Sequence, residues 1–281
     1  MSGSRVYFQN VARDNGYARV AVAPATAASS KRSILGLTCE RVHFAGGRGI
    51  CLAPKRTLGA LAFTASIFGP DMRVRKTLTL SGINSRTRVS PDGRYGAATG
   101  FVAGHSYAQG DFSTETTLID LATGKKVANV EEFRVEREGR RLRSGDFNFW
   151  GVTFAPNSDR IYATLATRGT TYLVEGSIAA RRFRVVHENV ECPSLSPDGT
   201  RVAYKKRIGD AGEWRLHVLD LRTLKETPLA ERRPLDDQAE WLDDRRILYG
   251  FEGDVWVVPA DGTGEPRVFL EDALSPAVVR S

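Results

Sequence analysis

The chain has 281 residues, of which 41% are hydrophobic, and it carries a formal net charge of +7. No run of about 18 apolar residues occurs, which argues against a membrane-spanning helix. The 40 basic and 33 acidic residues are interspersed, so the excess charge is typical of a solvated surface and argues against a dedicated nucleic-acid-binding protein.

Two strands are expected near the start of the chain, at residues 5–9 and 17–22. They resemble the later strands of a four-stranded unit that lacks its first strand. The start shows no charged segment followed by an apolar one, as a signal peptide would. Because the first strand begins almost at the terminus, we expect a signal or anchor to precede it in an extracytoplasmic protein. A complete chain would instead be cytoplasmic.

Cys39 and Cys51 flank a short hairpin-like segment and are candidates for a disulfide. Such a bridge would favour an oxidising compartment. If the hairpin turns at Gly46 and Gly47, Cys51 lies opposite Val42, so a bridge to Cys39 requires a bulge or an irregular strand end. The alternative is two separately buried thiols, and the third cysteine, Cys192, is expected to be buried and unpaired.

One unit recurs along the chain and predicts a strand, a tight turn and a second strand. Its best copies contain the turns Pro91-Asp92-Gly93 and Pro197-Asp198-Gly199, each preceded by serine. Proline presets φ, aspartate bonds nearby backbone and glycine accepts positive φ, so these residues are structural turn formers. The five turns fall near Gly46, Asp92, Asn157, Asp198 and Asp243.

A second unit follows some of these turns, and it predicts two further strands. Its copies include residues 117–125, 216–225 and 255–263, where a strand ends in a polar turn. The turns of the first unit are 46, 65, 41 and 45 residues apart, as expected for four-stranded propeller blades. The long interval predicts an insertion over the charged residues 131–146.

The two chain ends complete the predicted ring. Residues 275–279 read as a first strand without successors, which complements the incomplete unit at the N-terminus. Joining them closes the ring and protects the free edges. The sequence therefore predicts an all-β fold in which residues 1–281 form one six-bladed β-propeller of four-stranded antiparallel blades, with one blade shared by both termini.

The paired units resemble the repeats of TolB-like propellers. The best matches are Ser196-Pro197-Asp198-Gly199 with residues 218–221, and Ser90-Pro91-Asp92-Gly93 with residues 119–124. The resemblance spans residues 5–279, but the chain has no separate N-terminal α/β domain as full-length TolB does. It implies an extracytoplasmic binding module, and related propellers also precede the hydrolase domain of prolyl oligopeptidases.

Motifs for catalysis are sparse. The four histidines show no metal-ligand spacing, and no complete nucleophile elbow or phosphate-binding loop is present. His43 and His217 lie in strand patterns and are interpreted as structural. His105 and Tyr107, in a polar loop, are the candidates to face a ligand. No catalytic, cofactor-binding or metal-binding residue is predicted.

We therefore expect a monomeric, non-enzymatic binding or scaffolding module without a cofactor. Its partner would be a protein or a small ligand at a face of the ring or in the central funnel, where loops converge. The segments 100–113 and 131–146 are the expected binding loops. A membrane association would require a tether that this chain lacks. The alternatives are a lyase or glycoside hydrolase that uses carboxylates in the funnel, and a detached regulatory propeller of a peptidase.

Overall fold

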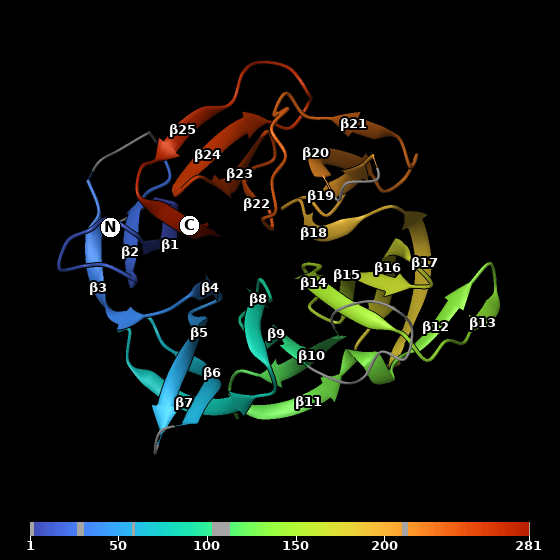
Figure 1. The fold of residues 1–281 in the computed structure, drawn as a ribbon, viewed down its shortest axis with the longest axis horizontal. Helices are drawn as coiled ribbons and strands as arrows, with labels where there is room; N and C mark the ends of the chain where they lie inside the picture. The colour runs from blue at the N-terminus through green and yellow to red at the C-terminus, as the bar shows by residue number, and fades with distance from the viewer. Residues whose placement is uncertain (1–2, 27–30, 58–59, 103–112, 210–212, 281) are drawn as a thin grey trace.

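A computed structural model of the chain shows six β-sheets arranged around a central axis (Figure 1). The structure describes residues 3–26, 31–57, 60–102, 113–209 and 213–280. These residues form the predicted all-β, six-bladed propeller, and their only helix is the short 3₁₀ turn η1 (Val130–Glu132). The prediction of the fold class is confirmed.

The blades are numbered along the chain, and their strands are given from the centre of the ring outward. Blade 1 consists of β26 (Ala273–Val279), β1 (Arg5–Asn10), β2 (Arg19–Pro24) and β3 (Ser33–Thr38). Blade 2 consists of β4 (Arg41–Ala45), β5 (Arg48–Thr57), β6 (Ala60–Phe68) and β7 (Val74–Leu80). Blade 3 consists of β8 (Ile83–Val89), β9 (Tyr95–Val102), β10 (Ser113–Asp120) and β11 (Lys125–Asn129).

The second half of the ring follows the same plan. Blade 4 consists of β14 (Asn148–Phe154), β15 (Arg160–Thr167), β16 (Thr170–Ser177) and β17 (Arg182–Glu188), with β12 (Arg134–Arg137) and β13 (Arg140–Leu142) added outside β17. Blade 5 consists of β18 (Glu191–Leu195), β19 (Arg201–Ile208), β20 (Glu213–Asp220) and β21 (Glu226–Pro228). Blade 6 consists of β22 (Glu240–Asp243), β23 (Arg246–Phe251), β24 (Asp254–Pro259) and β25 (Arg267–Leu270).

The turn that follows an inner strand shows why the repeat needs its residues. In blade 3, the Asp92 carboxylate accepts hydrogen bonds from the Ser90 hydroxyl at 2.7 Å and the Arg94 N–H at 2.9 Å. The Gly93 N–H donates to the Ser90 carbonyl at 2.8 Å, and Gly93 has a φ of +69°. The turn around Asp198 repeats this pattern, with Gly199 at +72°. These side chains therefore terminate the inner strand and reverse the chain.

Ring closure joins the two ends of the chain in one blade. β26 pairs antiparallel with β1, with Arg5 opposite Val279 and Val6 opposite Val278 (Figure 1). Ala277 and Phe8 are fully buried there. The two incomplete units of the sequence thus form one four-stranded sheet, as expected.

The inserted segment, expected to be a loop, contains two strands at the outer edge of a blade. β12 pairs in parallel with β17, and β13 pairs antiparallel with β12, so the segment extends the outer edge of blade 4. Val135 and Phe133 are buried against Phe183 in the core between blades 3 and 4. The apolar residues scattered among its charges therefore anchor the hairpin far from the central axis.

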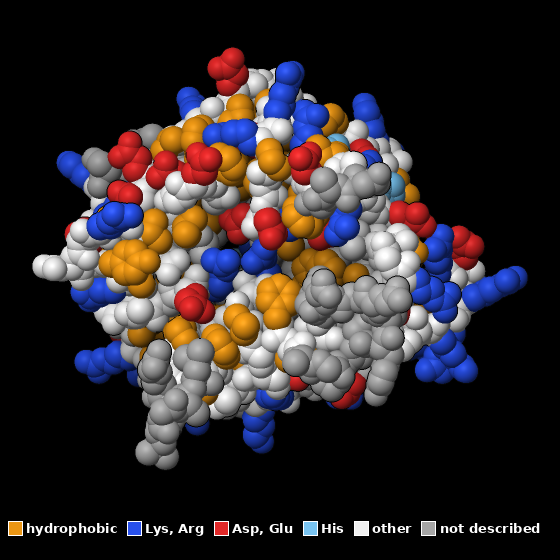
Figure 2. Space-filling model, viewed as in Figure 1, with side chains coloured by type: hydrophobic (Ala, Val, Ile, Leu, Met, Phe, Trp, Pro, Cys, Tyr) orange, Lys and Arg blue, Asp and Glu red, His pale blue; other side chains and the backbone are white. Residues whose placement is uncertain are grey.

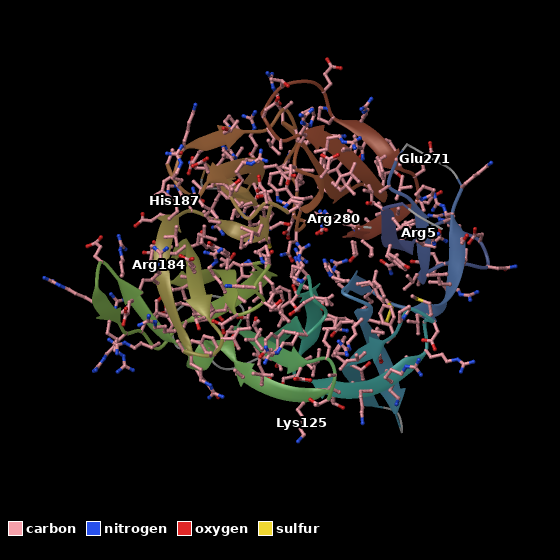
Figure 3. The ribbon with its side chains drawn as sticks, turned by 180° about the vertical axis from the view of Figure 1, so that it is seen from behind. Arg5, Lys125, Arg184, His187, Glu271 and Arg280 are labelled. Carbon is pink, nitrogen blue, oxygen red and sulfur yellow. A yellow bond between two sulfur atoms is a disulfide. The ribbon has the colours of Figure 1, made fainter. Side chains whose placement is uncertain are left out.

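The structure joins Cys39 and Cys51 by a disulfide, with Cα atoms 5.3 Å apart (Figure 3). Cys51 lies opposite Val42 in the β4–β5 ladder, as the turn at Gly46 and Gly47 requires. Cys39 precedes β4 and its N–H bonds to the Ala18 carbonyl, so it is outside the ladder and reaches Cys51 from the strand end. A cross-link of this short separation contributes about 3 kcal/mol in the chain-entropy model.

Candidate functional site: the central channel

Five side chains from one position of the repeat line the middle of the channel. Each lies within an inner strand, three residues before the first residue of the turn that follows. The set comprises His43 of β4, Arg88 of β8, Thr153 of β14, Ser194 of β18 and Glu240 of β22. Successive residues of a strand point to opposite sides, so the same repeat position faces the axis in each of these five blades.

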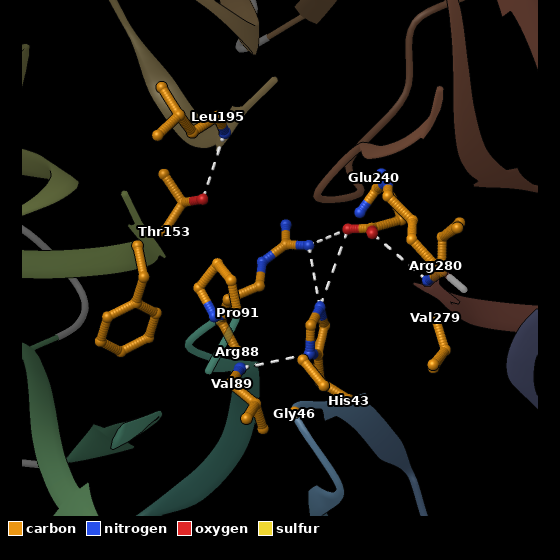
Figure 4. A pocket seen from close by; sticks show the side chains of 13 residues that line it. His43, Gly46, Arg88, Val89, Pro91, Thr153, Leu195, Glu240, Val279 and Arg280 are labelled. Carbon is orange, nitrogen blue, oxygen red and sulfur yellow. Dashed lines mark hydrogen bonds and ion pairs between the residues drawn. The ribbon is translucent and has the colours of Figure 1, made fainter. Parts of the chain in front are cut away.

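Arg88 and Glu240 form a buried ion pair across the channel (Figure 4). Their side chains are 9% and 6% exposed. Arg88 also donates to the Ser194 hydroxyl at 3.2 Å and to the Ala239 carbonyl at 3.1 Å. The Nε2 atom of His43 lies 3.2 Å from Arg88 and 3.8 Å from the Glu240 carboxylate. Arg88 therefore links inner strands on both sides of the ring.

A repeated backbone contact connects neighbouring blades in this layer. The Val89 N–H donates to His43 Nδ1 at 3.2 Å, and the Leu195 N–H donates to the Thr153 hydroxyl at 3.1 Å. The Val278 N–H of the closing strand donates to Glu240 at 3.3 Å. In each contact, an inner strand binds the channel side chain of the preceding blade. We call His43, Arg88, Thr153, Ser194 and Glu240 the hub.

The protonation states of the hub follow from burial and charge. Burial lowers the pKa of His43, although its bond to Glu240 acts in the opposite direction. Burial alone would raise the pKa of Glu240, but Arg88 and His43 offset this effect and lower it to about 2. His43 is therefore neutral at pH 7, and Glu240 is ionised.

Acid is expected to destabilise the ring through the hub. The lowered pKa of His43 means that the unfolded chain binds more protons below its ordinary value of about 6.5, so stability falls as the pH drops through that value. The lowered pKa of Glu240 adds a second loss between 4.5 and about 2. Urea unfolding of the wild type and of His43→Gln at pH 8, 6 and 5 tests this. An unchanged pH dependence in the variant would contradict the assignment to His43.

A second charged layer surrounds one opening of the channel, at the ends where the inner strands begin. Arg86 lies 3.3 Å from Asp236, and Lys205 also pairs with Asp236. Arg41 donates to the Ser85 carbonyl at 3.0 Å, and Asp237 accepts from the Gly250 N–H. We call the side of the ring that carries this opening the mouth face. The opposite side, which carries the turns around Asp92 and Asp198, is the turn face. Figure 2 shows basic and acidic side chains together at the centre of the ring.

A cavity of about 180 Å³ lies on the turn-face side of the hub (Figure 4). His43, Arg88, Thr153, Glu240 and Arg280 contribute its polar lining, and Figure 3 shows Arg280 near the centre of the ring. Arg280 donates to the Trp241 carbonyl. The cavity can accept a water-sized or small polar group, but its charges already have partners within the ring.

The other histidines, Tyr107 and the third cysteine lie away from the hub or outside the described residues. His105 and Tyr107 lie outside the described residues. His187 binds Glu226 at 2.7 Å between blades 4 and 5, and His217 is buried next to the Tyr204 ring. Cys192 is a buried free thiol in the inner strand of blade 5. Among the described residues, no group of three or more His, Cys, Asp and Glu side chains is placed to hold a metal ion, and no helix is long and apolar enough to span a membrane.

Sequence reasoning missed the hub, although a signal for it was present. Each hub side chain reads as an ordinary strand residue when taken alone. Aligning the five turns places all of them in one column, directly before an apolar residue that enters the core. Polar residues at the same position of successive blades must meet around the axis, and that column is the pattern that identifies the channel lining.

Comparisons with known proteins agree on the fold. No family model matches the sequence, and no curated protein matches it. TolB from Acinetobacter baumannii has a TM-score of 0.63 and 14% identity over 99% of this chain, which spans 66% of that chain. A structure from the nidogen/laminin complex has a TM-score of 0.62 and 8% identity, covering 98% of both chains. A TolB-like structure from Agrobacterium tumefaciens has a TM-score of 0.52 and 11% identity, covering 97% of this chain and 91% of that one.

The ring, its closure and its polar channel define the class as a six-bladed β-propeller. Within that class, the likeness to the two TolB structures makes the fold TolB-like, as the turn units predicted.

Proposed function

We propose that this propeller is a non-enzymatic binding or scaffolding module outside the cytoplasm, which holds a protein partner on its mouth face. The observation that carries the proposal is the internal pairing of the channel charges. Glu240 is bound by Arg88, and Asp236 is bound by Lys205 and Arg86. In this proposal, the central carboxylates serve to hold the ring together through these ion pairs.

The pairing argues against the alternative of a lyase or glycoside hydrolase. A general acid of this kind needs a raised pKa, and a retaining or inverting hydrolase needs two facing carboxyl groups. The pKa of Glu240 is instead lowered, and the pKa of Asp236 is lowered by Lys205 and Arg86 against the opposing effect of burial. Both groups are poor proton donors at neutral pH.

The mouth face is suited to a charged protein surface. Asp236 keeps 61% of its side chain exposed although it is paired, and Glu40 is exposed beside Arg41 at the start of β4. Mixed charges around a rigid opening favour specific, electrostatically steered association. One structure similar to this chain comes from the nidogen/laminin complex, which supports a binding role for such a ring. The disulfide supports an oxidising compartment.

Site-specific photo-crosslinking in the native cells tests this proposal. A photoreactive residue at Ile83, which is 58% exposed at the mouth-face start of β8, is expected to capture a protein, and one at Asp261, in an exposed turn on the turn face, is not. Glu40→Lys should then reduce the yield at position 83 about tenfold, as expected for reversal of one complementary charge at an interface. Equal capture from both faces, or an unchanged yield with Glu40→Lys, would contradict the proposed placement.

A further inference from the structure

The outer part of blade 4 presents an arginine-rich sheet surface that the proposed function does not use. The pairing of β13, β12, β17, β16 and β15 places side chains of one side in register. Glu136 lies opposite Arg141 and Arg184, Arg134 lies opposite Arg182, and Glu175 lies opposite Arg184. We call this surface the basic face, and it comprises Arg134, Arg141, Arg160, Arg182 and Arg184 with Glu136 and Glu175.

The two sides of this sheet have different chemistry. Val135, Leu142 and Phe183 lie on the other side and pack into the core between blades 3 and 4. On the basic face, the side chains of Arg184, Arg134 and Arg160 are 66%, 54% and 46% exposed. Arg141 and Arg182 are also exposed. The hairpin is thus anchored by one side and holds the arginines in water on the other.

The acids on the basic face neutralise only part of its charge. Glu136 pairs with Arg134 at 3.0 Å, and Glu175 is shared by Arg184 and Arg160. Arg141 and Arg182 have no acidic partner among the described residues. Figure 2 shows basic side chains gathered at the margin of the ring over β12, β13 and β17, and Figure 3 places Arg184 beside the root of the hairpin.

The position of the basic face restricts the shape of a ligand. Tyr162 and Leu173 lie on the same side of the sheet, nearer the axis, and pack against Leu195 and Val202 of blade 5. The arginines therefore lie on the side of blade 4 that faces blade 5, outward of this packing. A linear polymer can follow these strands beside blade 5, where a flat membrane has less access.

The residue types restrict the chemistry of the ligand. Arginine presents a planar fork of donors that binds phosphate oxygens in pairs. Neighbouring strands are about 4.8 Å apart and alternate residues of a strand about 7 Å, which gives a grid of cations. An acidic peptide carries its carboxylates on flexible side chains that must be ordered on binding, whereas a phosphate polymer carries its charges on the backbone itself. No exposed aromatic side chain lies among the described arginines, so base stacking is not provided.

We propose that the basic face binds a linear, phosphate-bearing polymer, which lies across β13, β12 and β17 and is held mainly by Arg141 and Arg182. This site is separate from the mouth face and does not depend on the proposed protein partner. The binding is electrostatic, so its affinity falls steeply as the salt concentration rises.

The test compares two variants of equal charge with long-chain inorganic polyphosphate as the probe. Arg141→Gln/Arg182→Gln removes the two unpaired arginines of the basic face. Arg13→Gln/Arg140→Gln removes two exposed arginines elsewhere, since Arg140 lies opposite Arg137 on the other side of the hairpin. The first variant is expected to raise Kd about tenfold or more and to reduce the slope of log affinity against log salt by about 1 to 2. The second is expected to stay within about twofold of the wild type, and both should melt as the wild type does.

The two variants and three further ligands distinguish a phosphate polymer from other possible ligands of the basic face. Equal weakening by both variants would show a general charge effect and overturn the site. Polyglutamate binding as tight as polyphosphate would indicate an acidic protein partner instead. Anionic phospholipid vesicles that lose affinity only with the first variant would indicate a membrane surface, and a single-stranded oligothymidylate that binds more tightly than polyphosphate would indicate a nucleic acid. Each of these outcomes overturns the assignment to a phosphate polymer.

Discussion

Replacing Arg88 with methionine is expected to lower the free energy of unfolding by about 3–5 kcal/mol, because it leaves the Glu240 carboxylate buried without its cation. The change also removes the donors to Ser194 and to the Ala239 carbonyl. Several blades therefore lose contact at once, and the ring should unfold at a lower urea concentration in one cooperative step. Urea titration followed by tryptophan fluorescence measures the difference.

A matched substitution shows whether the destabilisation is specific to Arg88 or follows from the loss of any paired arginine. Arg246 pairs with Asp243 at 2.6 Å, but the two side chains are 40% and 42% exposed. Arg246→Met is therefore expected to cost at most about 1 kcal/mol. The double variant Arg88→Met/Glu240→Gln should be more stable than Arg88→Met alone, since no charge is left unpaired in the channel. If Arg88→Met costs no more than Arg246→Met, the ion pair is not what joins the blades.

The hub explains why the sequence predicts the blades more fully than the site. Each turn unit is local: Pro91, Asp92 and Gly93 determine one reversal from neighbouring residues, so the blades can be counted along the chain. The contact between Arg88 and Glu240 spans 152 positions and forms only when blades 3 and 6 face each other across the axis. No local sequence pattern indicates such a long-range contact. Only the shared repeat position of Arg88 and Glu240 indicates that the two side chains meet.

The strands of the inserted segment and the disulfide also depend on contacts between distant parts of the chain, which local sequence patterns do not indicate. The charged residues 131–146 predict a solvated loop, yet the burial of Phe133 and Val135 against a neighbouring blade makes the segment an added pair of strands. The β4–β5 register places Cys51 opposite Val42, so the ladder alone leaves a bridge to Cys39 undecided. Cys39 precedes β4, and its N–H donates to the Ala18 carbonyl just before β2 of blade 1, so its position depends on a contact between two blades.

Deleting residues 273–281 is expected to abolish cooperative folding. The deletion removes β26, exposes the fully buried Val6 and Phe8 of β1, and takes away the Val278 N–H that binds Glu240. The lost burial and pairing are comparable with the whole stability of a domain, which is about 5–15 kcal/mol. The free edge of β1 would also promote association of chains. Loss of the sigmoidal urea transition, with larger particles by light scattering, is the expected result.

A circular permutant distinguishes the need for the strand from the need for a free C-terminus. Arg5 and Val279 are directly paired, so a short turn can join β26 to β1, and the chain can be opened at the exposed turn between Glu138 and Gly139. The permutant retains the β26–β1 pairing and should unfold cooperatively, within about 2 kcal/mol of the wild type, because opening at an exposed turn is tolerated. A truncated chain as stable as this permutant would mean that β26 does not close the ring. In the permutant, β26 and β1 form a continuous hairpin, so blade 1 stays intact. Any remaining decrease in the free energy of unfolding then measures the effect of opening the β12–β13 hairpin at the outer edge of blade 4.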